Sequence, residues 1–148
     1  MDVVSKKDAT IIGILAFQLA SRGADYVSGN PKTGMGAFEV SEYTPAMVWG
    51  ITCLIVAALV TASLVAQAPR FLRVGAIIAM CVYLAFSVLA VNDAVRGGLD
   101  DWRFFTGYLA AAAMWGVMAG SLTIRIAIMD SREGDGGVER PNRAARNN

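Results

Sequence analysis

Residues 46–66 read AMVWGITCLIVAALVTASLVA, and these 21 consecutive positions contain no charged side chain. A run of about 20 apolar residues is long enough to cross the roughly 30 Å hydrocarbon core of a bilayer as a helix. Two more uncharged runs follow, at residues 74–91 and 104–124. Three such runs in a chain of 148 residues exclude a soluble globular, a fibrous and a disordered protein.

The amino-acid composition limits the kinds of chemistry that we expect of this protein. Charged residues make up 17% of the chain, against about 25% in soluble domains. The chain has no histidine, so it lacks the usual general base and the commonest metal ligand. Its cysteines, Cys53 and Cys81, lie inside apolar runs, where we expect small buried hydrophobes. The net charge of +1 does not favour nucleic-acid binding. We therefore expect no enzyme activity, no metal, no cofactor and no nucleic-acid partner.

The N-terminal segment predicts a further membrane helix. Residues 9–27 span about 28 Å as a helix, although Gln18 interrupts the apolar stretch. Lys6 and Lys7 before that stretch also resemble a signal peptide. The polar residues Arg22 and Asp25, and the three runs that follow, favour a membrane helix.

Helix-start and helix-stop residues set the expected boundaries. Thr44-Pro45 is a typical helix start, Gly97-Gly98 a typical end, and the turn around residues 67–70 makes its two helices antiparallel neighbours. The predicted fold class is all-α: an integral membrane four-helix bundle at residues 1–130, followed by a mobile, disordered, charged tail at 131–148. The helices are expected at about 8–27, 45–66, 69–94 and 101–129.

Basic residues predict the orientation, because they favour the cytoplasmic side of a membrane. Four spans place both termini on one side. The terminal side holds nine of the 13 basic residues: Lys6, Lys7, Arg70, Arg73, Arg125, Arg132, Arg140, Arg143 and Arg146. The termini are therefore predicted to lie in the cytoplasm. The acidic residues of the opposite side are expected to be solvated loop and capping groups: Glu39, Glu42, Asp93, Asp100 and Asp101.

Gln18, Arg22 and Asp25 are the first candidate functional group. Their spacings of four and three place them on one face of the first helix. In lipid, a polar stripe has to face protein or water. The stripe either lines a shared polar interface or aqueous lumen, or Gln18 makes a single interhelical hydrogen bond while Arg22 and Asp25 mark the membrane boundary.

Small residues form the second candidate group. Ala112, Gly116 and Gly120 recur at a spacing of four in the last helix, and Gly75 and Ala79 form a shorter version in the third. Small residues at this spacing allow a second helix to approach closely. The sequence leaves open whether that helix belongs to another copy or to the same bundle.

The layout resembles small multi-span proteins from the lysis regions of phages that infect actinobacteria, many of them holins or holin-like. The resemblance lies in the basic start Ser5-Lys6-Lys7, in the hairpin spans, in residues 42–50 (EYTPAMVWG) and in the charged tail from Arg132 to Arg146. Small multidrug-resistance transporters are similar in helix count, but they depend on a carboxylate deep in the first helix, where this chain has Gln18.

This resemblance implies a membrane protein of the bacterial cytoplasmic membrane that forms homo-oligomers and permeabilises the bilayer for host lysis. Its expected partners are the lipid bilayer, further copies of itself and another phage lysis protein. The alternative is a non-lytic membrane interaction protein, such as a subunit, an assembly factor or a phage exclusion protein. A small transporter is the third interpretation.

Overall fold

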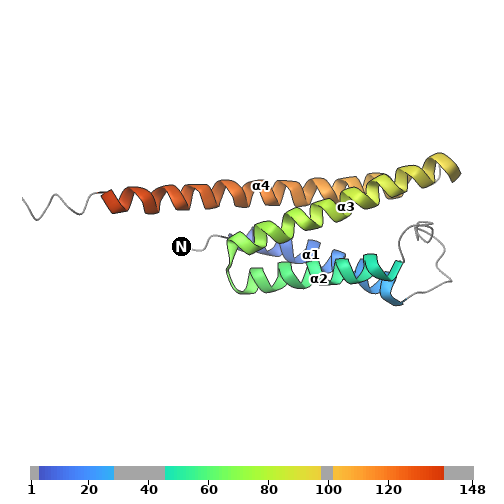
Figure 1. The fold of residues 1–148 in the computed structure, drawn as a ribbon, viewed down its shortest axis with the longest axis horizontal. Coiled ribbons are helices and arrows are strands. Elements are labelled where there is room, and N and C mark those ends of the chain that lie inside the picture. Colours follow the sequence, from blue (N-terminus) through green and yellow to red (C-terminus); the bar gives the residue numbers. More distant parts are fainter. Residues whose placement is uncertain (1–3, 29–45, 98–101, 139–148) are drawn as a thin grey trace, which may run out of the picture.

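The computed structural model of the chain describes residues 4–28, 46–97 and 102–138. The described chain is helical and forms four helices (Figure 1): α1 (Lys6–Ser28), α2 (Ala46–Val65), α3 (Pro69–Gly97) and α4 (Trp102–Val138). The all-α prediction is therefore confirmed. The first three helices begin and end within three residues of the expected positions.

Local residues explain where the helices begin and turn. Ser5 caps α1, because its hydroxyl oxygen accepts a hydrogen bond from the backbone N–H of Asp8 at 3.2 Å. Between α2 and α3 the chain reverses within three residues, and Gln67 adopts a positive φ of 52° there. Pro69 then occupies the first position of α3, where a missing N–H is tolerated.

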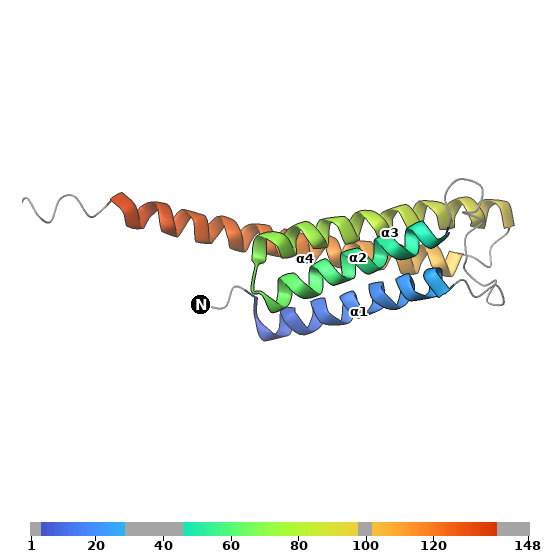
Figure 2. The ribbon, with the colours of Figure 1, turned by 60° about the horizontal axis from the view of Figure 1, so that its bottom comes forward.

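The four helices form two tightly packed hairpins. The contacts within the pairs α1/α2 and α3/α4 are extensive, those between α2 and α3 are intermediate, and α1 touches α4 at few positions. Figure 2 shows α1 beside α2 and α2 beside α3, with α4 closing the bundle behind them. The α1/α4 seam is therefore the least packed side of the bundle.

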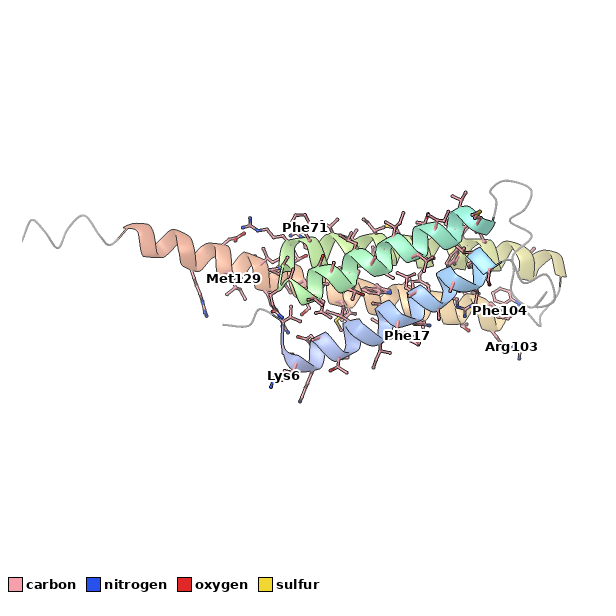
Figure 3. The ribbon with its side chains drawn as sticks, turned by 90° about the horizontal axis from the view of Figure 1, so that it is seen from below. Lys6, Phe17, Phe71, Arg103, Phe104 and Met129 are labelled. Carbon is pink, nitrogen blue, oxygen red and sulfur yellow. The ribbon has the colours of Figure 1, made fainter. Side chains whose placement is uncertain are left out.

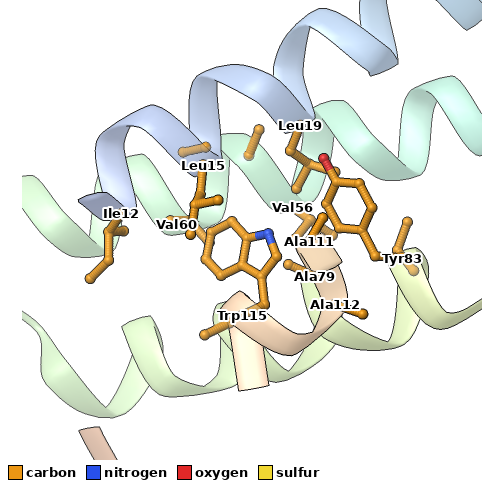
Figure 4. Close-up of a cluster of buried hydrophobic side chains, with 14 of the residues drawn as sticks. Ile12, Leu15, Leu19, Val56, Val60, Ala79, Tyr83, Ala111, Ala112 and Trp115 are labelled. Atoms are coloured by element: carbon orange, nitrogen blue, oxygen red, sulfur yellow. The ribbon is translucent and has the colours of Figure 1, made fainter. Parts of the chain in front are cut away.

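The interior is apolar and centres on Trp115 of α4, which is fully buried. Figure 4 shows its indole ring among side chains from α1, α2 and α3, including Leu15, Val60 and Ala79. Each helix contributes side chains at helical spacing, so the core runs along the bundle axis. A single contiguous core joins both hairpins.

The structure corrects the boundary of the tail. Residues 131–138, predicted to belong to the mobile tail, continue α4 as helix to Val138, and Figure 1 shows this end of α4 projecting beyond the other helices. Asp130 is anchored to Arg70 of α3 by an ion pair of 3.1 Å. The hydroxyl of Ser131 donates to the carbonyl oxygen of Ala127 at 2.9 Å. The rest of the predicted tail, residues 139–148, lies outside the described residues.

Three helices are long and apolar enough to cross a membrane: residues 47–65 of α2, 69–91 of α3 and 102–132 of α4. Many of their large apolar side chains are exposed on the outside of the bundle, where a soluble protein would carry polar groups. Figure 3 shows Phe71 and Phe17 pointing away from the bundle. The chain thus has the character of a helical membrane protein. The membrane crossing of α1, which carries five charged residues, stays a prediction.

Candidate functional site: a polar helix face and an arginine among aromatic rings

The structure divides the predicted polar stripe of α1 into two parts. Gln18 and Asp25 are exposed on the outside of the bundle. Arg22 is half-buried and turns toward α4, because its guanidinium group contacts Tyr108. The three residues therefore form two separate features of α1: the exposed pair Gln18 and Asp25, and the half-buried Arg22.

Gln18 and Asp25 belong to a longer outer polar face of α1. Its polar members are all exposed: Lys7, Thr10, Gln18, Ser21, Asp25 and Ser28. Its three hydroxyl groups donate to carbonyl oxygens of α1 itself, at 2.9–3.1 Å. The amide of Gln18 and the carboxylate of Asp25 are therefore the groups of this face, besides the terminal Lys7, that depend most on water or a partner.

The opposite face of α1 is apolar and packs into the bundle. Its buried residues are Ile12, Leu15, Ala16, Leu19 and Gly23. The helix contains 23 residues, or about 34 Å at 1.5 Å per residue. α1 is thus an amphipathic helix of membrane-spanning length whose outward side carries these polar groups together with the exposed apolar side chains of Ile14 and Phe17.

Arg22 extends across the α1/α4 seam. Its Nη1 donates to the hydroxyl oxygen of Tyr108 at 3.2 Å, and its Cζ lies 5.3 Å from the centre of the Tyr108 ring. Such a position over an aromatic face is a cation–π interaction. Among the residues that the structure describes, no carboxylate forms an ion pair with Arg22, and Asp25 on the next turn is exposed.

Aromatic rings from all four helices gather beside Arg22. Phe86 of α3 lies at the centre of this aromatic cluster and is completely buried. Its ring centre lies 5.3 to 6.2 Å from those of four others: Tyr26 of α1, Trp49 of α2, Tyr83 of α3 and Tyr108 of α4. Tilted and edge-to-face pairs at these distances are favourable. The cluster therefore packs the α1/α2 hairpin against the α3/α4 hairpin.

The bundle interior holds hydrogen-bond donors that have no partner within the described chain. Among them are the hydroxyl of Tyr83, which is 1% exposed, and the indole N–H groups of Trp49 and Trp115. Figure 4 shows the Tyr83 hydroxyl pointing from α3 toward α1, next to Leu19. Buried donors without partners are unfavourable and unusual in a native fold.

The predicted small-residue positions fall into different environments. Ala112 is in the core, and a Cβ atom added to Gly116 would lie 3.2 Å from the sulfur of Met80 on α3. Both positions therefore serve packing within the bundle. Gly120 is exposed and has open space around its missing side chain.

The shorter series on α3 also serves internal packing. A Cβ atom added to Gly75 would lie 2.8 Å from a methyl group of Val60, and Ala79 is fully buried. Both residues therefore pack inside the bundle, with Gly75 against α2.

Two structural contacts were missed by sequence reasoning. Gly23 of α1 and Gly50 of α2 face each other, and a Cβ atom on either would lie 2.9 Å from the carbonyl oxygen of the other. The sequence signal was present, because Ala16 and Gly23, like Gly50 and Ala57, are small residues seven apart.

The second missed contact is the ion pair between Asp8 of α1 and Arg125 of α4, at 2.7 Å across the α1/α4 seam. The pKa of Asp8 is lowered, first by the hydrogen bond from the side chain of Ser5 and further by Arg125, while partial desolvation opposes the shift. Asp8 and Arg22 are 14 residues apart, or about 21 Å. The seam is therefore held by polar contacts near both ends.

Within the described part of the chain, no three histidine, cysteine or acidic side chains come close enough to hold a metal ion. Four of the acidic residues expected on the outer side, Glu39, Glu42, Asp100 and Asp101, lie outside the described residues, and so does the side chain of Asp93. Cys53 is buried, whereas Cys81 is exposed; both are free thiols.

Comparison with known proteins yields no match, because no family model, no curated protein and no solved structure is significantly similar to this chain.

Proposed function

We propose that this protein is a holin-like membrane protein that assembles into homo-oligomers and permeabilises the bacterial cytoplasmic membrane. The observation that carries the proposal is the outer polar face of α1. A helix of membrane-spanning length packs its apolar side into its own bundle and leaves Gln18 and Asp25 on the outside.

The physical argument concerns where that face can be stable. An amide or a carboxylate that faces hydrocarbon without a partner costs several kcal/mol, because lipid offers no hydrogen bonds. The cost disappears when the face borders water or another protein surface. Several copies that turn their α1 helices toward a common centre would surround a water-filled lesion with these groups. The polar face therefore favours the assembled, permeable state over the isolated bundle.

The association surface in this proposal includes Gly120. Its exposed backbone allows a helix from another copy to approach α4 closely, whereas Ala112 and Gly116 are occupied by internal packing. Another phage lysis protein is a further partner in this proposal, acting once the membrane is permeable.

The proposed orientation places both termini in the cytoplasm. Figure 3 shows Lys6 and Arg103 at opposite ends of the bundle. Lys6 lies at the end where α1 begins and α2 turns into α3, and Arg70, Arg125 and the projecting part of α4 belong to that end as well. A concentration of basic residues at one end favours the cytoplasmic side.

Timed expression in a bacterial host, followed with a potential-sensitive dye, tests the proposal. The wild-type protein is expected to collapse the membrane potential abruptly after a delay, and a co-expressed endolysin should then lyse the cells. Gln18→Leu removes the central polar group of the face, so it should delay or abolish the collapse at equal membrane levels.

Phe17→Leu is the matched control. Phe17 neighbours Gln18 and is also exposed, but it is apolar, so its replacement should leave the timing unchanged. If the wild-type protein at full expression leaves the potential and the growth rate unaltered, the holin-like function is wrong, and a non-lytic interaction protein takes its place.

A further inference from the structure

Arg22 presents an unusual combination for a membrane helix. Its charged group is half-buried between α1 and α4, and no described carboxylate neutralises it. It lies six residues from the end of α1, and Tyr108 lies six residues into α4, about 9 Å inside the helix ends. A guanidinium group at this depth is costly unless a counter-ion or an acceptor accompanies it.

The surroundings of Arg22 consist of hydroxyl groups, a thiol and aromatic rings. Tyr26, Cys53 and Tyr83 are within electrostatic range of its charge, and they come from α1, α2 and α3. The hydroxyl of Tyr83 is buried, has no partner and points toward α1 beside Leu19, three residues and so about one turn before Arg22 (Figure 4). The indole N–H of Trp49, in the same aromatic cluster, also has no partner.

We propose that Arg22, Tyr83 and Trp49 form a binding site for a phosphate group at this end of the bundle. The three side chains offer a fixed positive charge and several hydrogen-bond donors, which is the complement of a phosphate group. Arginine binds phosphate oxygens with two parallel N–H groups, and hydrogen bonds of this charge-assisted kind are the strong ones. Because α1 and α4 are the least closely packed neighbouring helices, we place the entry of the ligand on this side of the bundle.

The phosphate has two possible sources, which share this chemistry. One is the head group of a phospholipid, because an α1 helix that crosses the bilayer as proposed would hold Arg22 near the head groups. The other is free inorganic phosphate, reaching the site from the aqueous end. The site goes beyond the proposed permeabilising function, since it would bind phosphate in a bundle that never forms a lesion.

The test uses the full chain purified in an uncharged detergent and phosphorus NMR of the added probe. The probes are dihexanoyl phosphatidylglycerol and, separately, inorganic phosphate. Saturable broadening of the probe signal is the expected result for one of them. Broadening by the lipid identifies a head-group site, and broadening by inorganic phosphate identifies a site for the free ion.

Three variants locate the site. Arg22→Gln should weaken binding at least roughly tenfold, because it removes the charge-assisted hydrogen bonds. Arg103→Gln removes an exposed arginine near the same end of the bundle and should leave the affinity unchanged. Tyr83→Phe should weaken binding several-fold and, without a probe, should not lower the unfolding midpoint, because its hydroxyl has no partner in the free protein.

The unfolding midpoint of Tyr83→Phe separates a binding role of the hydroxyl from a structural one. If the hydroxyl supported the fold, its removal would lower this midpoint. Absence of saturable broadening with both probes overturns the proposal. So does equal affinity of the wild-type protein and Arg22→Gln. Neither outcome bears on permeabilisation, which is measured in cells.

Discussion

The backbones of Gly23 in α1 and Gly50 in α2 are in direct contact, because the carbonyl oxygen of each occupies the space that a side chain on the other would need. A Cβ atom on Gly23 would also lie 2.8 Å from Leu54, and one on Gly50 would lie 2.8 Å from Val27. Backbone approach of this kind gives extensive van der Waals contact, which is the main force between helices in lipid. This backbone contact explains why α1 packs much more closely against α2 than against α4.

Alanine at either glycine should therefore destabilise the bundle. Gly23→Ala and Gly50→Ala each force α1 and α2 apart, and we expect a loss of about 1–3 kcal/mol, as for other overpacked sites. The measurement is the unfolding midpoint followed by circular dichroism during titration with dodecyl sulfate. Gly13→Ala on the same helix is the control, because its side chain would meet open space. That variant should gain about 0.5–1 kcal/mol from helix propensity. Equal effects of all three variants would contradict the close contact.

The ion pair between Asp8 and Arg125 should contribute to stability in a pH-dependent way. The lowered pKa of Asp8 means that the folded protein binds its proton less readily than the unfolded chain. Its contribution is therefore complete above the ordinary value of 3.8 and is lost as the pH falls below that value, through the lowered pKa. Unfolding of the wild type and of Asp8→Asn, compared from pH 7 to pH 3, checks this.

At neutral pH we expect Asp8→Asn to be less stable by about 1 kcal/mol or less, because the pair is partly exposed. The difference should shrink toward pH 3. A difference that stays constant across this range would show that the carboxylate charge of Asp8 is not what stabilises the bundle.

Leucine at Gly116 and at Gly120 should have different effects. Gly116→Leu drives a large side chain into Met80 and should destabilise the monomer, whereas Gly120→Leu points into open space and should leave the monomer folded. Cross-linking in membranes then reports on association. We expect Gly120→Leu to reduce the oligomer fraction without changing the unfolding midpoint. Unchanged oligomers in a folded Gly120→Leu variant would place the association surface elsewhere.

Reporter fusions test the proposed orientation. Alkaline phosphatase is active only outside the cytoplasm, so a fusion after Gly97 should be active and one after Val138 inactive. We expect this pattern because basic residues are concentrated at the end of the bundle that includes Lys6 and Arg125, and basic residues favour the cytoplasmic side. Fusions to β-galactosidase, which is active only inside the cytoplasm, should give the opposite pattern at the same two sites. An active phosphatase after Val138 would reverse the arrangement.

Helix positions were predictable from local pattern alone. The bounds of α1, α2 and α3 follow closely from features of neighbouring residues in the sequence. These features are the uncharged runs of membrane length, Pro69 at a helix start and the short turn around Gln67. The end of α4 was predicted too early. The composition beyond Asp130 suggested a mobile tail, but α4 continues as a helix to Val138.

The candidate site was predictable only in part. Helical spacing placed Gln18, Arg22 and Asp25 on one side of α1, and two of the three are indeed exposed together. The long side chain of Arg22 instead reaches sideways to Tyr108, and such a reach depends on which helix lies next to α1. Spacing likewise could not show that Ala112 lies in the core and Gly116 faces α3, while Gly120 faces outward.

The sequence by itself determined that this chain is helical, that three of its helices are apolar enough for a membrane and that α1 is amphipathic. These properties depend on composition and on the period of the α-helix, which are local. Only the tertiary structure decided which groups meet: Gly23 with Gly50, Asp8 with Arg125, and Arg22 with the aromatic cluster. In a bundle of apolar helices most faces are nearly equivalent, so small residues and a few polar side chains select the packing among many alternatives of the same period.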